Sequence, residues 1–179
     1  PMRLDTDIGP VIDRGAQEAL NAHAARMDRE GRLVAEVPLP GACDAGTFFA
    51  PRAYEIDAIA RLHGEVFGPI LHVVRYEASR LGEVCEAINA TGYGLTLGVH
   101  SRIDDTVDFV RARVRVGNLY VNRSQIGAVV GVQPFGGEGL SGTGPKAGGP
   151  HYLHRFAVER VVSTNTTAAG GNASLLSLE

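Results

Sequence analysis

The sequence predicts an α/β fold: a mostly parallel, twisted sheet flanked by helices. Helix-like and strand-like apolar patterns alternate along the 179 residues, and strand-helix-strand units of this kind favour parallel strands joined by right-handed crossovers. Hydrophobic residues make up 44% and charged residues 21%, which is typical of a globular chain with a buried core and argues against disorder.

The first half of the chain predicts one helix and three strands. The helix is expected at 13–29, capped by Asp13, because apolar residues recur there at helical spacing. These residues are Ala16, Ala19, Leu20, Ala24 and Met27. The strands are expected at 33–37, at 47–56 and at 69–76, where the most apolar run predicts a buried strand.

The second half predicts two helices, three strands and a tail. The helices are expected at 81–90 and 103–113, and the strands at 95–100, 117–122 and 156–162. The last strand leads into a small, polar segment that could bury little surface and would either dock on a neighbouring subunit or fray. The N-terminal residues contain turn formers and no starting element, so the chain is expected to be part of something larger.

The charge and the cysteines argue against several classes of function. The net charge is −3, so no basic field points to nucleic acid or to an anionic membrane. Cys43 and Cys85 stand far apart without a CxxC motif, which argues against a zinc site or a disulfide framework and fits a reducing, cytoplasmic setting. Cys85 is expected to be buried on a helix, and Cys43 to be a loop thiol without a base.

Glycine is concentrated towards the C-terminus, and a literal GxGxxG motif stands at 137–142. In a dinucleotide-binding fold that motif would open a helix whose N-terminus meets the phosphates. Here Pro145 and Pro150 follow closely, which disfavours a long helix and dinucleotide binding by this loop. Two interpretations stay open: a rigid packing loop, or a loop whose backbone amides converge on an anionic group.

A second candidate is the acid Glu65, which lies with Phe67 between Gly64 and Pro69, just before the most apolar strand. The carboxylate could accept hydrogen bonds from sugar hydroxyls while the ring packs on a flat heterocycle. A solvated carboxylate in a turn explains the same residues, and their chemistry alone favours that simpler interpretation.

Four segments, in order and at matching spacing, resemble the aldehyde dehydrogenases. EVFGP at 65–69 is similar to the E-x-F-G-P motif of that family, and NATGYGLT at 89–96 to its N-x-T-x-Y-G-L-T segment. GNLYVNR at 117–123 is similar to its G-N-x-Y-V-N-R strand, and DTDIGPVI at 5–12 to the D-x-D-x-G-P-x-I segment that follows the nucleophile loop. The ordered set covers nearly the whole chain, and it is more specific than any one of its motifs.

A narrower resemblance lies in residues 126–150, which are similar to the anchor loop of pyrroline-5-carboxylate dehydrogenases. Residues 165–174 narrow it to the bacterial proline utilization A subfamily, which joins a proline dehydrogenase to the aldehyde dehydrogenase. The resemblance implies oxidation of L-glutamate γ-semialdehyde to L-glutamate with NAD, in proline catabolism. FAD would belong only to the proline dehydrogenase part and not to this segment.

The resemblance also implies roles for particular residues. Glu65 would bind the nicotinamide ribose, and Phe67 would lie near the nicotinamide ring. The backbone amides of Gly127 and Ala128 would hold the substrate carboxylate, while Phe135 would pack on its aliphatic chain. Such amides can donate to a carboxylate without any cationic side chain.

The resemblance places the catalytic residues of the family outside this sequence. The nucleophilic cysteine of the family stands in a G-Q-x-C-S segment, and neither Cys43 nor Cys85 has that context. The isolated chain is therefore expected to be inactive, with no catalytic or metal-binding residue of its own. Because the amides of the anchor loop would suffice to hold the carboxylate, the charge of Lys146 is expected to matter little for the preference for a charged substrate.

Residues 1–155 are accordingly expected to form part of a catalytic domain, and residues 156–179 a strand and tail for oligomerisation. The partners would be a small-molecule substrate, the rest of the parent enzyme and a second copy of the chain, with no nucleic-acid contact. Two alternatives stay open. One is a catalytically dead remnant that serves as an interaction or oligomerisation module; the other is a stand-alone nucleotide-binding domain, which requires a helix opened by residues 137–142.

Overall fold

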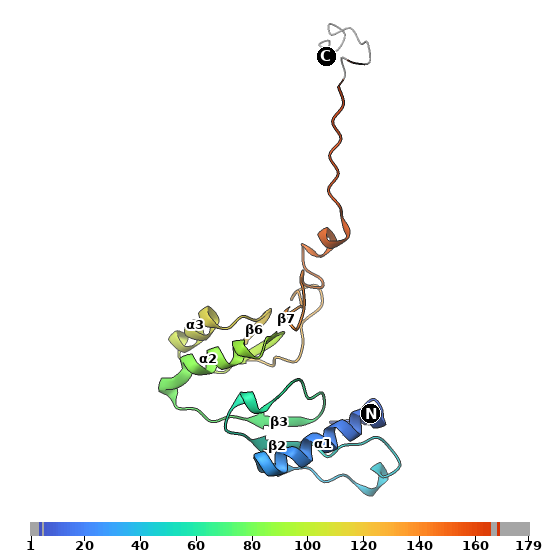
Figure 1. Cartoon of the computed structure of the whole chain (residues 1–179), viewed down its shortest axis with the longest axis vertical. Coiled ribbons are helices and arrows are strands. Elements are labelled where there is room, and N and C mark those ends of the chain that lie inside the picture. The colour runs from blue at the N-terminus through green and yellow to red at the C-terminus, as the bar shows by residue number, and fades with distance from the viewer. Residues whose placement is uncertain (1–3, 5, 166–167, 169–179) are drawn as a thin grey trace.

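The computed structural model describes residue 4, residues 6–165 and residue 168. Helices and strands alternate along the chain, which confirms the α/β class (Figure 1). The α-helices are α1 (Arg14–Glu30), α2 (Leu81–Ala90) and α3 (Asp104–Arg113). The strands are β1 (Arg32–Glu36), β2 (Arg52–Glu55), β3 (Ile70–Val73), β4 (Tyr93–Gly94), β5 (Thr96–Val99), β6 (Asn118–Val121) and β7 (Glu138–Gly139). Short 3₁₀ turns lie at Gly41–Cys43, Ile59–Arg61, Ala78–Arg80 and Tyr152–Phe156.

Helix α1 begins where the sequence predicted, because the side chain of Asp13 accepts a hydrogen bond from the amide of Ala16 (2.7 Å) and caps the first turn. One face of the helix packs on the strands and the segment before β2. The buried residues of this contact are Leu20, Ala24, Met27, Phe49, Tyr54 and Ile56. The hydroxyl of Tyr54 donates to Asp28 on α1 (2.7 Å), so the buried ring also has a polar partner.

The strands are divided among three small sheets, and their pairing is more mixed than the sequence predicted. Strand β2 lies between β1 and β3, antiparallel to β1 and parallel to β3. Strands β5 and β6 are parallel and are joined through α3, as expected of a strand-helix-strand unit. Strands β4 and β7 pair antiparallel. Residues 37–51 connect β1 to β2 as a loop whose helical part is one 3₁₀ turn, and antiparallel pairs need no crossover helix.

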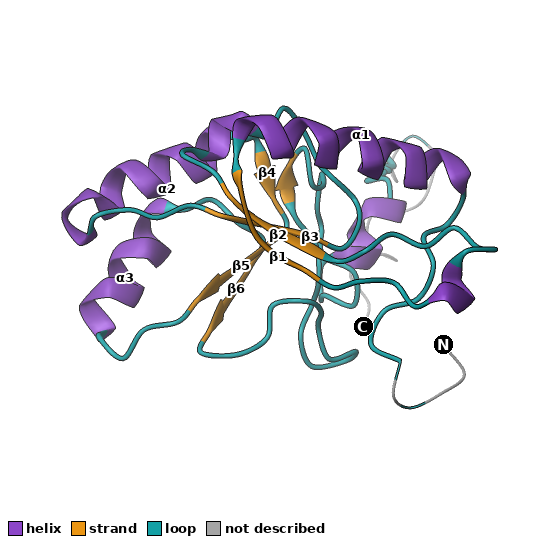
Figure 2. Cartoon of the chain, turned by 90° about the horizontal axis from the view of Figure 1, so that it is seen from below, coloured by secondary structure: helices purple, strands orange, loops and turns teal. Residues whose placement is uncertain are grey.

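Helices α1 and α2 lie on the same side of strands β1 to β3 (Figure 2). Ile70 of β3 packs against the core residues of α1. Leu71, the next residue, is 61% exposed, because successive side chains of a strand point to opposite faces. The prediction that this strand is buried is therefore wrong for one of its two faces.

A second small core lies between α2, α3 and β5. Cys85 of α2 is 1% exposed and packs with Val110 and Val114, which confirms the predicted burial of this cysteine. Burial raises the pKa of the Cys85 thiol, so the thiol stays protonated and inert. Cys43 lies in the 3₁₀ turn at Gly41–Cys43 and, like Cys85, is a free thiol.

The strand predicted at 156–162 is not formed. The 3₁₀ turn at Tyr152–Phe156 includes the first of these residues, and residues 157–165 run away from the body of the molecule (Figure 1). Alternating apolar residues predicted a strand, but a strand also needs a neighbour to pair with, and no described strand pairs with this segment. Its valines stay exposed, namely Val158, Val161 and Val162.

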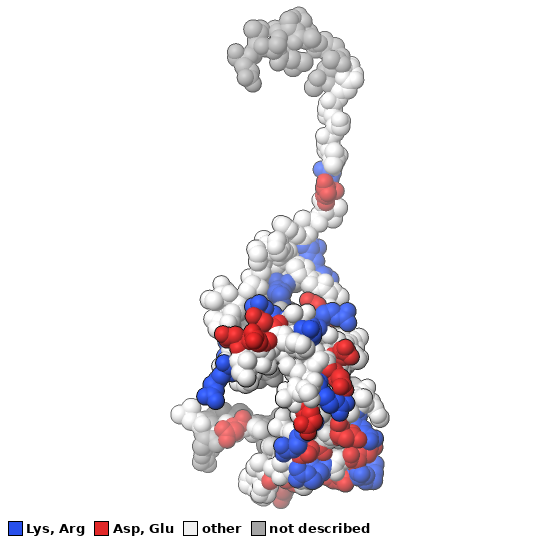
Figure 3. Space-filling view, turned by 90° about the vertical axis from the view of Figure 1, so that its left-hand side faces the viewer, with Lys and Arg blue, Asp and Glu red and all other residues white. Residues whose placement is uncertain are grey.

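Acidic and basic side chains are intermixed on the body, whereas the extended C-terminal segment carries few charges (Figure 3). Neither sign of charge dominates the face shown in that view. None of the described helices is long and apolar enough to cross a membrane.

Candidate functional site

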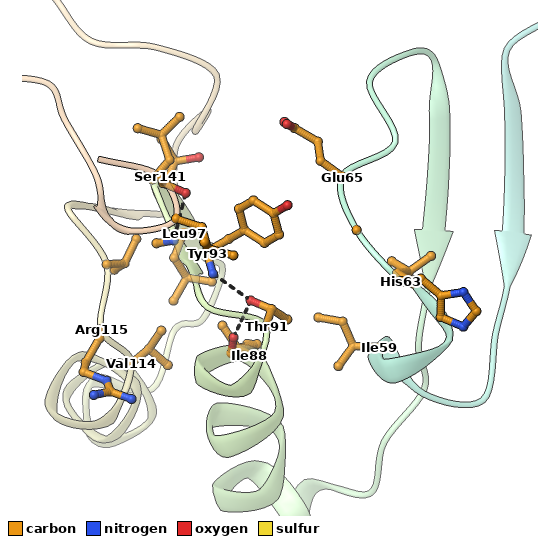
Figure 4. A pocket seen from close by; sticks show the side chains of 17 residues that line it. Ile59, His63, Glu65, Ile88, Thr91, Tyr93, Leu97, Val114, Arg115 and Ser141 are labelled. Carbon is orange, nitrogen blue, oxygen red and sulfur yellow. Dashed lines mark hydrogen bonds between the residues drawn. The ribbon is translucent and has the colours of Figure 1, made fainter. Parts of the chain in front are cut away.

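A cavity of about 550 Å³ lies between the segment 59–65 on one side and the α2, β4 and β5 region on the other. Glu65 and Tyr93 extend into it from opposite walls, while the ring of His63 points away (Figure 4). The wall that bears Tyr93 is held by local hydrogen bonds. Thr91 donates to the carbonyl of Ile88 (2.7 Å) and accepts from the amide of Tyr93 (3.2 Å).

The loop that carries Glu65 and Phe67 is fixed against α1 by Gly68. A Cβ atom on Gly68 would lie 2.6 Å from the side chain of Leu20 on α1, closer than real contacts allow. The glycine therefore lets the loop approach the helix closely. Glu65 is exposed at the opening of the cavity, and the ring of Phe67 is 86% exposed. A free carboxylate beside a free aromatic ring suits a ligand that has hydroxyl groups and a flat ring.

From here on, the name anchor loop is kept for residues 123–134, the segment that follows β6. The second group of candidate residues lies in this loop and at Phe135, just after it. Ala128 and Phe135 line one cavity of about 280 Å³, and Gly127 precedes Ala128 in the chain. Among the described residues, no acceptor is found for the amide N–H of Gly127 or for that of Ala128. Two adjacent unpaired amides beside an aromatic ring can bind a carboxylate that is attached to an apolar chain.

The turn that follows these amides is held by its own hydrogen bonds. The amide of Val129 donates to the side chain of Gln133 (2.9 Å), and the amide of Gln133 donates back to the carbonyl of Val129 (2.9 Å). Gly131 within this turn has a φ of 78°, which favours glycine. The turn is thus closed on itself, which leaves the preceding amides available.

The GxGxxG motif does not open a helix. Its second and third residues form β7, which pairs with β4. Gly139 has a φ of 60°, and a Cβ there would lie 2.4 Å from the carbonyl oxygen of Gly92. The motif is therefore a packing element, and the observed structure contradicts the interpretation of the chain as a stand-alone nucleotide-binding domain.

Lys146 is more deeply involved in the structure than the sequence predicted. Its ammonium group donates to the carbonyl oxygens of Gly117 and Gly136 and to the side chain of Asn118. These contacts give Lys146 a structural role; they do not test the expectation that its charge matters little for substrate preference. These partners lie 10 to 29 residues away in sequence, so no local pattern could reveal them.

The five candidate residues fall into two separate places. Glu65 lines the larger cavity and Phe67 lies in the same loop, whereas Ala128 and Phe135 line the smaller cavity with Gly127 next to it. The two cavities share no lining residue. Sequence reasoning missed Tyr93 and Ser141 in the larger cavity, where the Ser141 hydroxyl accepts a hydrogen bond from the amide of Gly94 (3.0 Å).

Two histidines make a contact that the sequence did not predict. The Nε2 atoms of His23 on α1 and His72 on β3 lie 2.9 Å apart. Burial lowers the pKa of both imidazoles, and the nearby Arg26 lowers them further. The pair is thus kept neutral, as expected of structural histidines. Among the described residues, no group of three or more His, Cys, Asp or Glu side chains could hold a metal ion.

Comparison with known proteins agrees with the resemblance noted in the sequence. The aldehyde dehydrogenase family model matches residues 1–162. The bifunctional protein PutA of Escherichia coli (strain K12) is 58% identical over 165 residues, which make up 89% of this chain and 12% of that protein. The 1-pyrroline-5-carboxylate dehydrogenase of Geobacillus thermodenitrificans is 40% identical over 165 residues, or 91% of this chain and 31% of that protein.

Solved structures give the same result. A mutant of proline utilization A from Bradyrhizobium japonicum superimposes with a TM-score of 0.84 at 61% identity, over 91% of this chain and 16% of that one. The 1-pyrroline-5-carboxylate dehydrogenase from Thermus, determined with bound NAD, gives a TM-score of 0.74 at 40% identity, over 83% of this chain and 28% of that one. The chain thus spans less than a third of each of these relatives. It belongs to the aldehyde dehydrogenase family.

Proposed function

We propose that this chain is part of an NAD-dependent dehydrogenase that oxidises L-glutamate γ-semialdehyde to L-glutamate in proline catabolism. The observation that carries the proposal is the pair of adjacent amides at Gly127 and Ala128, which have no acceptor among the described residues, with Ala128 lining the same cavity as Phe135. The names of the relatives, 1-pyrroline-5-carboxylate dehydrogenase and PutA, support it. The complete enzyme, meaning the longer protein to which the chain would belong, would supply the nucleophile and the general base.

In this proposal the anchor loop binds the substrate by its main chain. The amides of Gly127 and Ala128 donate to the substrate carboxylate, and Phe135 packs on the carbon chain between the carboxylate and the aldehyde. Amides that are fixed before the substrate arrives bind an anion without a further ordering cost. The turn closed by Gln133 keeps them available, because Val129 bonds to Gln133 and not to the amides before it.

Glu65 and Phe67 are the proposed contacts to NAD. The exposed carboxylate of Glu65 suits the hydroxyls of the nicotinamide ribose, and the exposed ring of Phe67 suits the nicotinamide. NAD, when bound, accepts the hydride from the substrate. The described residues offer no glycine-rich turn into a helix for the phosphates, so we assign this chain only the nicotinamide end of the cofactor. FAD would belong to the proline dehydrogenase part of the parent enzyme and not to this segment.

The proposal extends to partners and location. Residues 1–155 would be part of the catalytic domain, and residues 156–179 would mediate self-association through the exposed extended segment. Residues 166–167 and 169–179 lie outside the described residues. The complete enzyme would act in the cytoplasm on a small-molecule substrate, without nucleic-acid contact from this segment.

The test compares kcat/KM of the complete enzyme for glutamate semialdehyde and for an uncharged aldehyde of equal length. We expect a strong preference for the charged substrate, and we expect Gly127→Val to reduce it about tenfold or more, since hydrogen bonds to a charged group contribute about 1.5–3 kcal/mol. A Cβ at Gly127 has nothing within 4 Å, so the valine would obstruct the substrate and not the fold. Ile126→Ala, which leaves the amides in place, is the control. Equal kcat/KM for the two substrates in the wild type would refute the proposal.

A further inference from the structure

Lys146 is half-buried at the base of the anchor loop, and its ammonium group is saturated by protein oxygens. It donates to the carbonyl of Gly117, to the carbonyl of Gly136 (2.8 Å) and to Oδ1 of Asn118 (3.1 Å). A lysine has three N–H donors, so none is left for a ligand. None of the described carboxylates lies within ion-pair distance of Lys146. The charge is therefore solvated by neutral oxygens that belong to two different parts of the chain.

Asn118 joins the same two parts. Its Nδ2 donates to the carbonyl of Pro134 (3.0 Å), and its Oδ1 accepts from the amide of Gly136 (3.2 Å). Asn118 is the first residue of β6, which leads into the anchor loop, and Pro134 and Gly136 stand where the loop ends. Lys146 and Asn118 thus form one network, the staple, which ties the start of β6, the strand that leads into the loop, to the exit of the loop.

The backbone at the staple is in direct contact. A Cβ on Gly117 would lie 1.8 Å from the carbonyl oxygen of Gly136, so only glycine allows this approach. Next to it, Phe135 and Ala147 exchange two backbone hydrogen bonds of 3.0 and 2.9 Å. Phe135 and Ala147 both line the cavity that contains Ala128. The staple therefore fixes the wall of the cavity as well as the exit of the loop.

We propose that Lys146 is a positioning residue for binding of the substrate carboxylate. With Asn118 it holds the exit of the anchor loop against the start of β6, whose other end is the entry of the loop, so that the amides of Gly127 and Ala128 keep one position relative to Phe135. A loop with fixed ends has fewer conformations to lose on binding, and small displacements of binding groups reduce rates severely. The role of Lys146 in substrate preference rests on the proposed function; the role in holding the loop does not.

The experiment uses the complete enzyme and three variants: Lys146→Met, Asn118→Ala and the double variant. We expect each single variant to raise KM for glutamate semialdehyde about tenfold, with a much smaller effect on kcat and on an uncharged aldehyde. The double variant should raise this KM little more than either single variant does, because the effects of two substitutions within one network do not add. Hydrogen exchange of the amides in residues 123–134 should become faster in all three.

Arg155→Met is the matched control. Arg155 also donates to a backbone carbonyl of the same region, that of Gly144, and to the Thr143 hydroxyl (3.1 Å), but it contacts neither Gly117 nor Asn118. It should leave both the substrate preference and the exchange of residues 123–134 unchanged.

Each other outcome is decisive. If Lys146→Met abolishes the preference for the charged substrate and Asn118→Ala retains it, the ammonium contacts the carboxylate directly and the proposal is overturned. The proposal is also overturned if kcat/KM falls equally for both substrates, because a general loss of structure gives that result. If the wild type prefers neither substrate, the proposed function fails, and the staple itself is then judged by hydrogen exchange alone: faster exchange supports it and unchanged exchange refutes it.

Discussion

Glu65 and Lys146 differ in the sequence range of the features that single them out, and this range decides what the sequence can predict of each. Glu65 is part of a contiguous motif, and the structure places it at the opening of a cavity. Lys146 makes its contacts with residues that precede it by 10 to 29 positions. The same holds for Ser141, which accepts from a backbone amide 47 residues away. Local motifs could therefore nominate site residues, but not the residues that position them.

Removal of the Glu65 carboxylate should weaken the productive binding of NAD. Glu65→Ala should raise KM for NAD in the complete enzyme, because the loss of charge-assisted hydrogen bonds costs about 1–3 kcal/mol. Glu77→Gln, which changes another exposed acid of the same half of the chain, is the control. Steady-state kinetics with NAD as the varied substrate gives the result. Unchanged KM and kcat in Glu65→Ala would assign this carboxylate to a solvated turn.

The contact between His23 and His72 predicts a dependence of stability on pH. Burial lowers the pKa of both imidazoles below the ordinary value of 6.5, so the unfolded state binds more protons than the folded state just below that pH. The stabilising contribution of the two neutral imidazoles to the free energy of unfolding is therefore complete above pH 6.5. It is lost as the pH falls towards the lowered pKa values of the folded state. The rate of thermal inactivation of the complete enzyme should rise over this range, and it should rise less in His72→Gln. The same pH profile in the wild type and in His72→Gln would show that the contact between the two histidines does not cause the pH dependence.

At the scale of elements, helices were predicted better than strands. Helix α2 has the predicted bounds, and α1 begins at its predicted cap, since both depend on residues within the helix itself. Strands β4 and β7 were missed, because each has two residues and consists partly of glycine. The strand predicted at 156–162 was wrong, because strand formation depends on a partner that the local sequence cannot specify.

The contact between the start of β6 and the segment after the anchor loop should not tolerate a side chain at Gly117. Gly117→Ala would place its Cβ 1.8 Å from the carbonyl oxygen of Gly136, and overpacking against backbone costs about 1–3 kcal/mol or more. We expect faster hydrogen exchange at residues 117–122 and 134–137 in the complete enzyme. Gly9→Ala is the control, because a Cβ there has nothing within 4 Å. Equal exchange in Gly117→Ala and the wild type would show that this contact is not close.

At the scale of the whole molecule, the chain has two small cores and an extended segment that leaves the body (Figure 1). Each of the two candidate sites lies at the surface of this arrangement, and their cavities are separate. The sequence predicted the α/β class and the family, because these depend on the order of motifs along the chain. The spatial relation of the two sites depends on the packing of distant segments, and no pattern in the sequence predicts it.

The isolated chain should not reduce NAD in the presence of an aldehyde. Neither cysteine is equipped as a nucleophile: Cys85 is buried with a raised pKa, and Cys43 has no base within hydrogen-bonding distance among the described residues. NADH formation measured by absorbance should equal the rate without protein. Activity of the isolated chain that disappears in Cys43→Ala would contradict both this expectation and the motif assignments.

The proposed function requires that the main chain of the anchor loop holds the substrate carboxylate. A crystal structure of the complete enzyme with L-glutamate, the proposed product, tests it most directly. We predict that one carboxylate lies about 2.9 Å from both amide nitrogens of Gly127 and Ala128, with Phe135 against the carbon chain and Lys146 still bound to Gly117 and Gly136. A carboxylate bound to the ammonium group of Lys146, or bound away from residues 126–135, would contradict the claim.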